Sequence, residues 1–138
     1  MNARRAPAMP SDTKAGPRIL IVEPDTGLRT ALSLMLKLSG YEVHHTGDGR
    51  QALAMHQSTP FDVIVTEILM PEMDGLELLL ALQKHSPIPR FILLSRKSRV
   101  PVEVFSRMAL QMGAEHLLRK PFRPEQLLAT VRQVLGEK

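Results

Sequence analysis

Hydrophobic positions follow two alternating periods along the chain from Arg18 onward. Short continuous apolar runs indicate strands that are buried on both faces, whereas apolar residues spaced three or four positions apart indicate amphipathic helices. The second of the five short runs alternates between apolar and polar residues, which is typical of an edge strand. Strands are therefore predicted at RILIV (18–22), YEVHHT (41–46), FDVIVTE (61–67), RFILLS (90–95) and HLLRK (116–120).

Helices are predicted in the intervals between these strands. Asp25 or Thr26 can cap the first helix, and Gly40 ends it. A turn at 47–49 comes before the second helix, and Pro124 fits the first turn of the last one. The later helices are predicted to run to about residue 58, from 75 to about 86, from about 101 to 112, and from 124 to about 135.

The alternation of strands and helices, (βα)₅, predicts a single α/β domain. Its sheet is expected to be parallel and doubly wound, with the strand order 2-1-3-4-5. Ligands bind such sheets at the carboxyl ends of the strands, where Glu23, Glu67, Ser95 and Lys120 each end an apolar run. Two carboxylates, a hydroxyl and an ammonium at one edge suit a phosphoryl-transfer pocket. The alternative is that the acids are simply solvated and Lys120 forms a surface ion pair.

The composition excludes several classes of protein. The chain has 138 residues and no cysteine, which rules out disulfides, thiolate metal sites and cysteine nucleophiles. No apolar run approaches the ~20 residues of a membrane span, and none follows Arg4 and Arg5 as a secretory signal requires. We therefore expect a cytoplasmic protein with no membrane partner. Residues 1–17 are rich in Ala and Pro, which predicts a disordered tail before a folded domain at 18–138.

The net charge of +4 is unevenly distributed along the chain. Residues 18–83 carry four basic and nine acidic residues, whereas residues 84–123 carry nine basic and two acidic residues. This asymmetry favours a directional surface field over general affinity for nucleic acids. The chain also has only five aromatic residues with which to stack on bases. Nucleic acid is therefore not an expected partner.

From Arg18 to Leu135 the chain resembles a response-regulator receiver domain, a family with a flavodoxin-like fold. The matching stretches are RILIVEPD, SGYEV, DVIVTEILMPEMDGLELL, FILLS and GAEHLLRKPF. In this family an Asp at the end of the third strand accepts a phosphoryl group from a histidine kinase, and an acidic pair after the first strand holds Mg²⁺. The resemblance implies a module of two-component phosphorelay signalling and not an enzyme.

The resemblance assigns roles to three retained residues. Ser95 matches the hydroxyl that contacts the phosphate in the family, and Lys120 matches the Lys that does the same. Pro121 matches the proline that follows this Lys, whose peptide bond is usually cis. A cis bond before Pro121 is expected to turn Lys120 into the pocket.

Three positions depart from the family pattern. Glu67 stands at the phosphoacceptor position, Pro24 follows Glu23 in the acidic pair, and Leu117 stands where a switching aromatic is common. Glu is one methylene longer than Asp, and displacements near 1 Å can cost about 10²-fold when reacting groups must align. Pro24 has no side-chain ligand for Mg²⁺, and Asp25 is better placed to cap a helix. The residues thus predict no metal, or only weak Mg²⁺ binding at Glu23 and Glu67 if any metal binds. Mg²⁺ is expected as a cofactor only if the chain can be phosphorylated.

The sequence allows two alternatives for the role of Glu67 and two for the role of Arg96. Glu67 either mimics an aspartyl phosphate by reaching Lys120 and Ser95, or pairs with Lys120 in a switch that no longer works. Arg96, with Lys97 and Arg99 beside it, either replaces the missing cation over the acids or belongs to a solvated loop.

The leading hypothesis is an atypical receiver, or pseudo-receiver, that acts as a protein-interaction switch with impaired or absent phosphorylation. Its expected partner is a histidine kinase or a separate output protein, and a homodimer through the last helices is a further option. The alternative is a working receiver that accepts a phosphoryl group from a histidine kinase with Mg²⁺ as cofactor.

Overall fold

Five parallel strands form one sheet in the order β2-β1-β3-β4-β5 in the computed structural model, which describes residues 16–84, 88–96 and 102–137. The order confirms the predicted flavodoxin-like, doubly wound topology, and β2 lies at an edge as expected. The predicted tail up to residue 15 and the basic residues Lys97 and Arg99 lie outside the described residues. The strands are β1 (Arg18–Val22), β2 (Glu42–Thr46), β3 (Val63–Glu67), β4 (Arg90–Ser95) and β5 (His116–Arg119).

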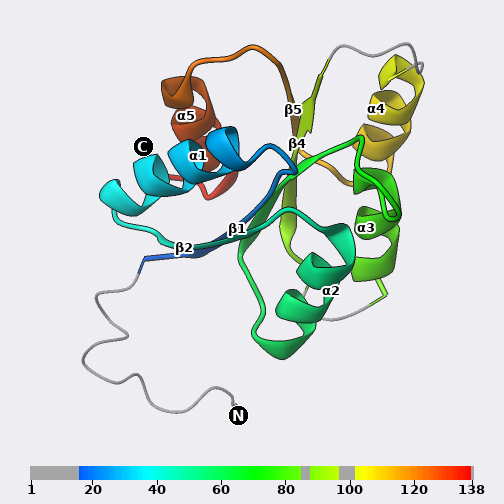
Figure 1. Cartoon of the computed structure of the whole chain (residues 1–138), viewed down its shortest axis with the longest axis horizontal. Coiled ribbons are helices and arrows are strands. Elements are labelled where there is room, and N and C mark those ends of the chain that lie inside the picture. The colour runs from blue at the N-terminus through cyan, green and yellow to red at the C-terminus, as the bar shows by residue number, and fades with distance from the viewer. Residues whose placement is uncertain (1–15, 85–87, 97–101, 138) are drawn as a thin grey trace.

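A helix follows each strand, and the helices cover both faces of the sheet. Helices α1 and α5 lie on one face, and α2, α3 and α4 lie on the other (Figure 1). This arrangement makes three layers with the sheet in the middle, so the inner strands are apolar on both faces. The helices are α1 (Thr26–Leu38), α2 (Gly49–Ser58), α3 (Gly75–Leu82), α4 (Val102–Gln111) and α5 (Pro124–Val134).

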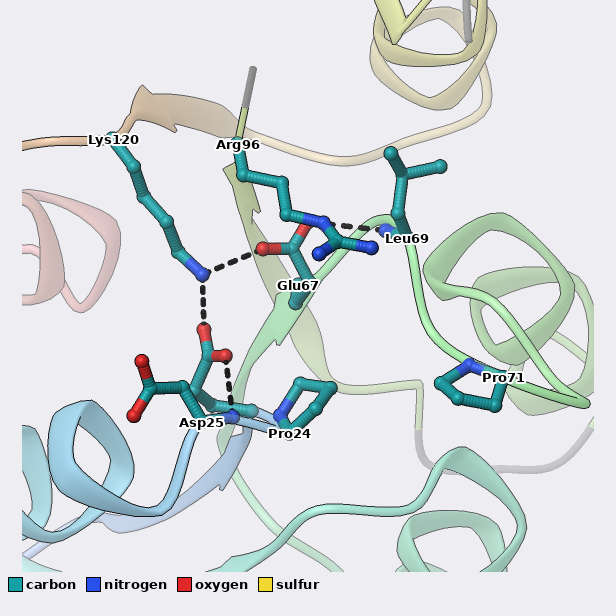
Figure 2. A pocket seen from close by; sticks show the side chains of 8 residues that line it. Pro24, Asp25, Glu67, Leu69, Pro71, Arg96 and Lys120 are labelled. Atoms are coloured by element: carbon teal, nitrogen blue, oxygen red, sulfur yellow. Dashed lines mark hydrogen bonds and ion pairs between the residues drawn. The ribbon is translucent and has the colours of Figure 1, made fainter. Parts of the chain in front are cut away.

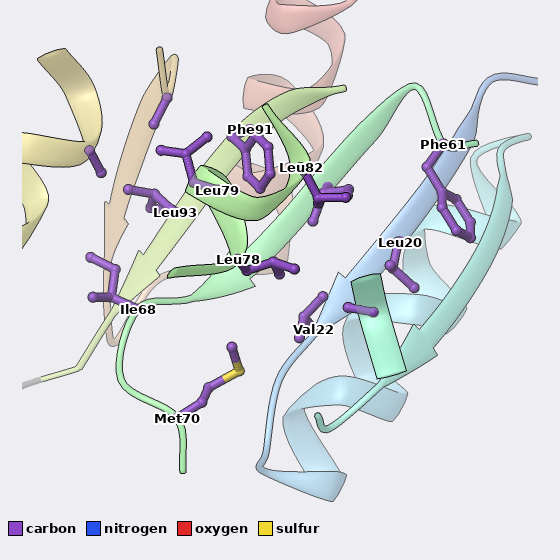
Figure 3. Packing of buried hydrophobic residues seen from close by; sticks show 14 residues of the cluster. Leu20, Val22, Phe61, Ile68, Met70, Leu78, Leu79, Leu82, Phe91 and Leu93 are labelled. Atoms are coloured by element: carbon purple, nitrogen blue, oxygen red, sulfur yellow. The ribbon is translucent and has the colours of Figure 1, made fainter. Parts of the chain in front are cut away.

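Two hydrophobic cores, one on each face of the sheet, hold the layers together. Side chains alternate along a strand, so Leu20 and Val22 of β1 face one core while Ile19 and Ile21 face the other. The core beneath α2, α3 and α4 is shown in Figure 3 and includes Leu20, Val22, Ala52, Phe61, Ile64, Ile68, Met70, Leu78, Leu79, Leu82, Phe91, Leu93, Ala109 and Ala114. The core beneath α1 and α5 includes Leu32, Leu36, Val63, Val65, Ile92, Leu94, Leu127 and Val131.

Two predicted boundaries differ from the structure by two residues or more, and several others differ by one residue. Strand β3 begins at Val63 and not at Phe61, because the amide of Phe61 donates to Nδ1 of the buried His56 at 3.0 Å and is not available to the sheet. Helix α3 ends at Leu82 and not near residue 86. Its end tightens because the amide of Lys84 bonds the carbonyl three residues back.

Glycines and caps fix where the helices begin and end. Gly40 and Gly113 follow α1 and α4 with φ of 102° and 119°, the left-handed conformation that glycine adopts without strain. Asp74 and Glu77 form a capping box at the start of α3.

In the part of the chain that the structure describes, no helix has both the length and the apolar character to cross a membrane.

Candidate functional site

The carboxyl ends of β1, β3, β4 and β5 bring the four predicted polar residues to one edge of the sheet. Glu67 is the last residue of β3 and Ser95 the last of β4, while Glu23 and Lys120 directly follow β1 and β5. The backbone amide of Lys120 donates to the carbonyl of Ser95 at 2.8 Å, which joins the last two strand ends. The predicted pocket is therefore assembled by the parallel register of the sheet.

Lys120 bridges the two glutamates. Its Nζ donates to Oε1 of Glu23 at 2.5 Å and to Oε1 of Glu67 at 2.6 Å, as the dashed lines in Figure 2 show. The carboxylates are 2% and 1% exposed, and the Lys120 side chain is 18% exposed. Burial alone lowers the pKa of Lys120, but the hydrogen bonds and charges of both glutamates outweigh it and raise the pKa above its ordinary value. Lys120 is therefore the cation that both acids share.

Backbone amides take up the other oxygen of each carboxylate. Oε2 of Glu23 accepts from the amide of Asp25 at 3.0 Å, and Oε2 of Glu67 accepts from the amide of Leu69 at 3.0 Å. Each glutamate is thus held at one end by an ammonium and at the other by its own loop. Charge-assisted hydrogen bonds of this kind are stronger than neutral ones, so the two side chains have fixed orientations.

The loop after β1 is fixed by the start of α1. The side chain of Asp25 caps α1 by accepting from the amide of Leu28 at 3.2 Å, so this carboxylate is used as a cap although it also lines the pocket. Arg29, in the first turn of α1, donates from Nη1 to the carbonyl of Glu23 at 2.7 Å. The helix start therefore sets the position of Glu23.

The loop after β3 is fixed by close packing at Gly75. The amide of Gly75 donates to the carbonyl of Ile68 at 2.7 Å. A Cβ on Gly75 would come within 2.7 Å of the Glu67 carbonyl oxygen, a distance that real Cβ atoms do not show. Only glycine lets α3 begin this close to the end of β3, which explains why Gly75 follows the MPEMD segment.

Ser95, Leu117 and Pro121 lie on β4, on β5 and just after β5, and they are not among the residues that line the pocket. Ser95 is 4% exposed at the end of β4, and the peptide bond between Lys120 and Pro121 is cis. Leu117 pairs with Leu93 across the sheet and packs, partly buried, against the core beneath α2, α3 and α4.

A pocket of about 380 Å³ opens over the bridge. It is lined by Glu23, Pro24, Asp25, Glu67, Leu69, Pro71, Arg96 and Lys120. Figure 2 shows Arg96 reaching from the end of β4 toward this pocket. None of the ion pairs among the described residues involves Arg96. The ion pairs to both glutamates are therefore made by Lys120, and Arg96 adds a further positive charge to the pocket wall.

Comparison with known proteins identifies this architecture. A family model described as "Response regulator receiver domain" matches residues 19–132. The chain belongs to the response regulator receiver domain family. Receiver domains are modules of two-component signalling, not typical enzymes, and they interact with histidine kinases and output domains.

Curated relatives and solved structures agree with this assignment. Response regulator MprA of Mycolicibacterium vanbaalenii is 38% identical over 120 residues, which are 86% of this chain and 50% of that protein. DNA-binding response regulator MtrA of Mycobacterium tuberculosis is 31% identical over 115 residues, 83% of this chain and 49% of that protein. This receiver domain thus spans about half the length of these relatives. The chemotaxis response regulator CheY4 of Vibrio cholerae superposes with a TM-score of 0.76 at 34% identity, covering 86% of this chain and 98% of that one.

The residues present do not fit the Mg²⁺ that receiver domains use. Pro24 offers no side-chain oxygen, Asp25 is engaged as a cap, and the Lys120 ammonium contacts both glutamates. Within residues 16–84, 88–96 and 102–137, no group of three or more acids or histidines is arranged to hold a metal ion. Mg²⁺ requires near-octahedral oxygen ligands, and a bound ammonium competes for the same oxygens.

Two residues of the site were missed by sequence reasoning. Arg29 secures the loop of Glu23, and the amide of Leu69 secures the Glu67 carboxylate. A basic residue one turn into α1 is a usable signal for the first. The second carries no signal, because any residue other than proline supplies a backbone amide.

Proposed function

We propose that this receiver domain signals through protein binding without accepting a phosphoryl group. The observation that carries the proposal is the bridge in which Lys120 contacts Glu23 at 2.5 Å and Glu67 at 2.6 Å. In a working receiver an oxygen of the phosphoacceptor carboxylate attacks phosphorus. Here an ammonium lies 2.6 Å from one oxygen of Glu67 and a backbone amide lies 3.0 Å from the other, so both oxygens have partners that compete with an incoming phosphoryl group.

Two further features support the loss of phosphorylation. Glu67 is one methylene longer than the family's Asp, which moves the nucleophile out of line with the other groups, and such displacements can cost about 10²-fold in rate. The second acidic position is Pro24, so the metal that would neutralise the incoming phosphate lacks a ligand. Each change weakens a different requirement of the reaction, so their effects combine.

The function that remains is recognition of a signalling partner, a histidine kinase or a separate output protein. The fold of the family is retained around a pocket whose charges satisfy one another. Lys120 ties the ends of β1, β3 and β5 together through its ion pairs with both glutamates. We infer that the bridge holds one conformation of the switch continuously, so partner binding does not depend on a phosphodonor.

The test is intact-mass measurement after incubation with acetyl phosphate and Mg²⁺. We expect no phosphoryl adduct on the wild-type chain, and the same thermal unfolding temperature with and without Mg²⁺. The matched comparison is the Pro24→Asp/Glu67→Asp double variant, which restores both family acids while retaining Ser95 and Lys120. Gain of one phosphoryl group by the double variant alone supports the proposal.

Ser95 and Lys120, retained at adjacent strand ends, favour a second candidate, a working receiver that uses Glu67 as its acceptor. A stable adduct on the wild-type chain that is absent from Glu67→Gln would establish this candidate and overturn the first.

A further inference from the structure

We propose that Arg96 is the residue that excludes divalent cations from the pocket, because it places a fixed positive charge on the pocket wall. The inference rests on the proposed function, because it explains how the pocket is kept free of Mg²⁺. Arg96 is not one of the acids of the pocket, and it is a different position from Glu67 and Pro24, where the chain departs from the family pattern.

The charged side chains that line the pocket nearly balance one another. Three carboxylates, those of Glu23, Asp25 and Glu67, give a formal charge of −3, and the two cations Lys120 and Arg96 bring it to −1. A working receiver also has the Lys that matches Lys120, so three carboxylates with that Lys carry a charge of −2 before any metal binds. Arg96 is the cation that this pocket has in addition, and its single charge supplies half the charge of a divalent ion.

The two cations hold different positions in the pocket. Lys120 is mostly buried and contacts two carboxylates directly. Arg96 is exposed, lines the same pocket, and forms none of the ion pairs found among the described residues. Its side chain reaches toward the pocket from the end of β4 (Figure 2). The guanidinium thus meets an incoming cation before the acids do.

Repulsion by this group is large enough to measure. A guanidinium stays protonated at all ordinary pH values, so the charge of Arg96 is constant. A single positive charge ~6 Å from a divalent ion in water weakens binding by about tenfold. Repulsion by Arg96 adds to the loss of metal ligands at Pro24 and Glu67. Restoring an Asp at only one of these two positions therefore does not recover the full affinity for Mg²⁺.

The experiment measures Mg²⁺ binding without any phosphodonor. Calorimetry and the NMR shift of the Leu69 amide are followed in Pro24→Asp/Glu67→Asp, with and without Arg96→Ala. We expect Arg96→Ala to tighten Mg²⁺ binding about tenfold, and Arg96→Lys to keep the weak affinity because it keeps the charge. Arg90→Ala is the matched control, since Arg90 lies at the opposite end of β4 and pairs with Glu115.

A second measurement covers the case in which the double variant does not fold. In the otherwise unchanged chain Mg²⁺ binding stays weak, and Arg96→Ala is expected to lower the Mg²⁺ concentration that shifts the Leu69 amide by about tenfold. Equal Mg²⁺ affinity with and without Arg96, or no binding in either, overturns the inference. A phosphoryl adduct on the wild-type chain instead overturns the proposed function, and it is read in a different assay.

Discussion

Replacing Lys120 by Met tests whether the Lys120 ammonium neutralises the carboxylates of Glu23 and Glu67 in solution. Met keeps much of the length of the lysine side chain and removes the ammonium that contacts Glu23 at 2.5 Å and Glu67 at 2.6 Å. Both carboxylates are almost fully buried, so neither gains much from water when the cation is lost. The variant therefore leaves two like charges next to each other inside the protein.

The size of the effect follows from this geometry. The two carboxylate oxygens contact the same nitrogen and lie at most about 5 Å apart, where two charges repel by roughly 3 kcal/mol at an effective dielectric constant of ~20. Removing one partner of a buried ion pair costs about 3–5 kcal/mol. Uptake of a proton limits this cost, because a carboxyl with an ordinary pKa near 4.3 is protonated at pH 7 for about 3.7 kcal/mol. We therefore expect Lys120→Met to lose about 3–4 kcal/mol at pH 7.

The limit set by protonation makes the loss dependent on pH. In the variant, the folded state binds a proton more tightly than the unfolded state, so stability is present at low pH and is lost as pH rises. The destabilisation should shrink to about 1 kcal/mol at pH 5. In the wild type the raised pKa of Lys120 keeps the bridge intact below the ordinary value of 10.5, and its contribution is lost only as pH rises beyond that.

Urea unfolding followed by circular dichroism at pH 5 and pH 7 measures both effects. At pH 7 the loss corresponds to a fall in unfolding temperature of roughly 10–20 °C for a domain of this size. Lys84→Met, the same substitution at an exposed position, is the control and should change stability by less than about 0.5 kcal/mol. Adding Glu23→Gln and Glu67→Gln to Lys120→Met should recover most of the loss. A loss below about 1 kcal/mol at pH 7, or an equal loss at both pH values, would show that the Lys120 ammonium does not neutralise two buried carboxylates.

Three further outcomes are expected. Burial and the hydrogen bond to Glu137 raise the pKa of Tyr41 to about 12, so the phenolate absorbance of this sole tyrosine should titrate near that pH and move toward 10.0 in Glu137→Gln. The stability linked to Tyr41 is present below pH 10.0 and is lost as pH rises toward 12. A wild-type midpoint at 10.0 would contradict this. Partial desolvation and the neighbouring charges of Arg29 and Lys37 lower the pKa of His45, although its side chain is exposed on the edge strand. Its NMR titration should have a midpoint below 6.5, and its contribution to stability should be lost as pH falls through that midpoint; a midpoint at or above 6.5 would count against these charged neighbours. Gly75→Ala should lower the free energy of unfolding in urea by about 1–3 kcal/mol, because its Cβ meets the backbone at the end of β3. Gly27→Ala in α1 is the control and should be neutral or stabilising by up to ~1 kcal/mol. Equal effects of the two substitutions would show that α3 does not begin so close to the end of β3.

The sequence alone determined the fold and the four polar residues at the carboxyl edge of the sheet. The periodicity of apolar residues predicted five strands and five helices, because strand and helix geometry repeat at 2.0 and 3.6 residues and burial is local to each element. The rule for parallel sheets then selected Glu23, Glu67, Ser95 and Lys120, and all four lie at the predicted edge. Boundaries were less secure where a side chain took up a backbone amide, as His56 does at the start of β3.

The tertiary structure decided how those residues share their charges. From the sequence, either Arg96 or Lys120 was able to face the glutamates, because both follow a strand at the same edge. Distances of 2.5 Å and 2.6 Å show that Lys120 contacts both, while Arg96 lines the pocket outside these pairs. The backbone amides that hold the other carboxylate oxygens, and the close approach at Gly75, likewise exist only once the loops are folded. Such contacts depend on positions in space to within an ångström, and a pattern of residue types along a chain does not specify them.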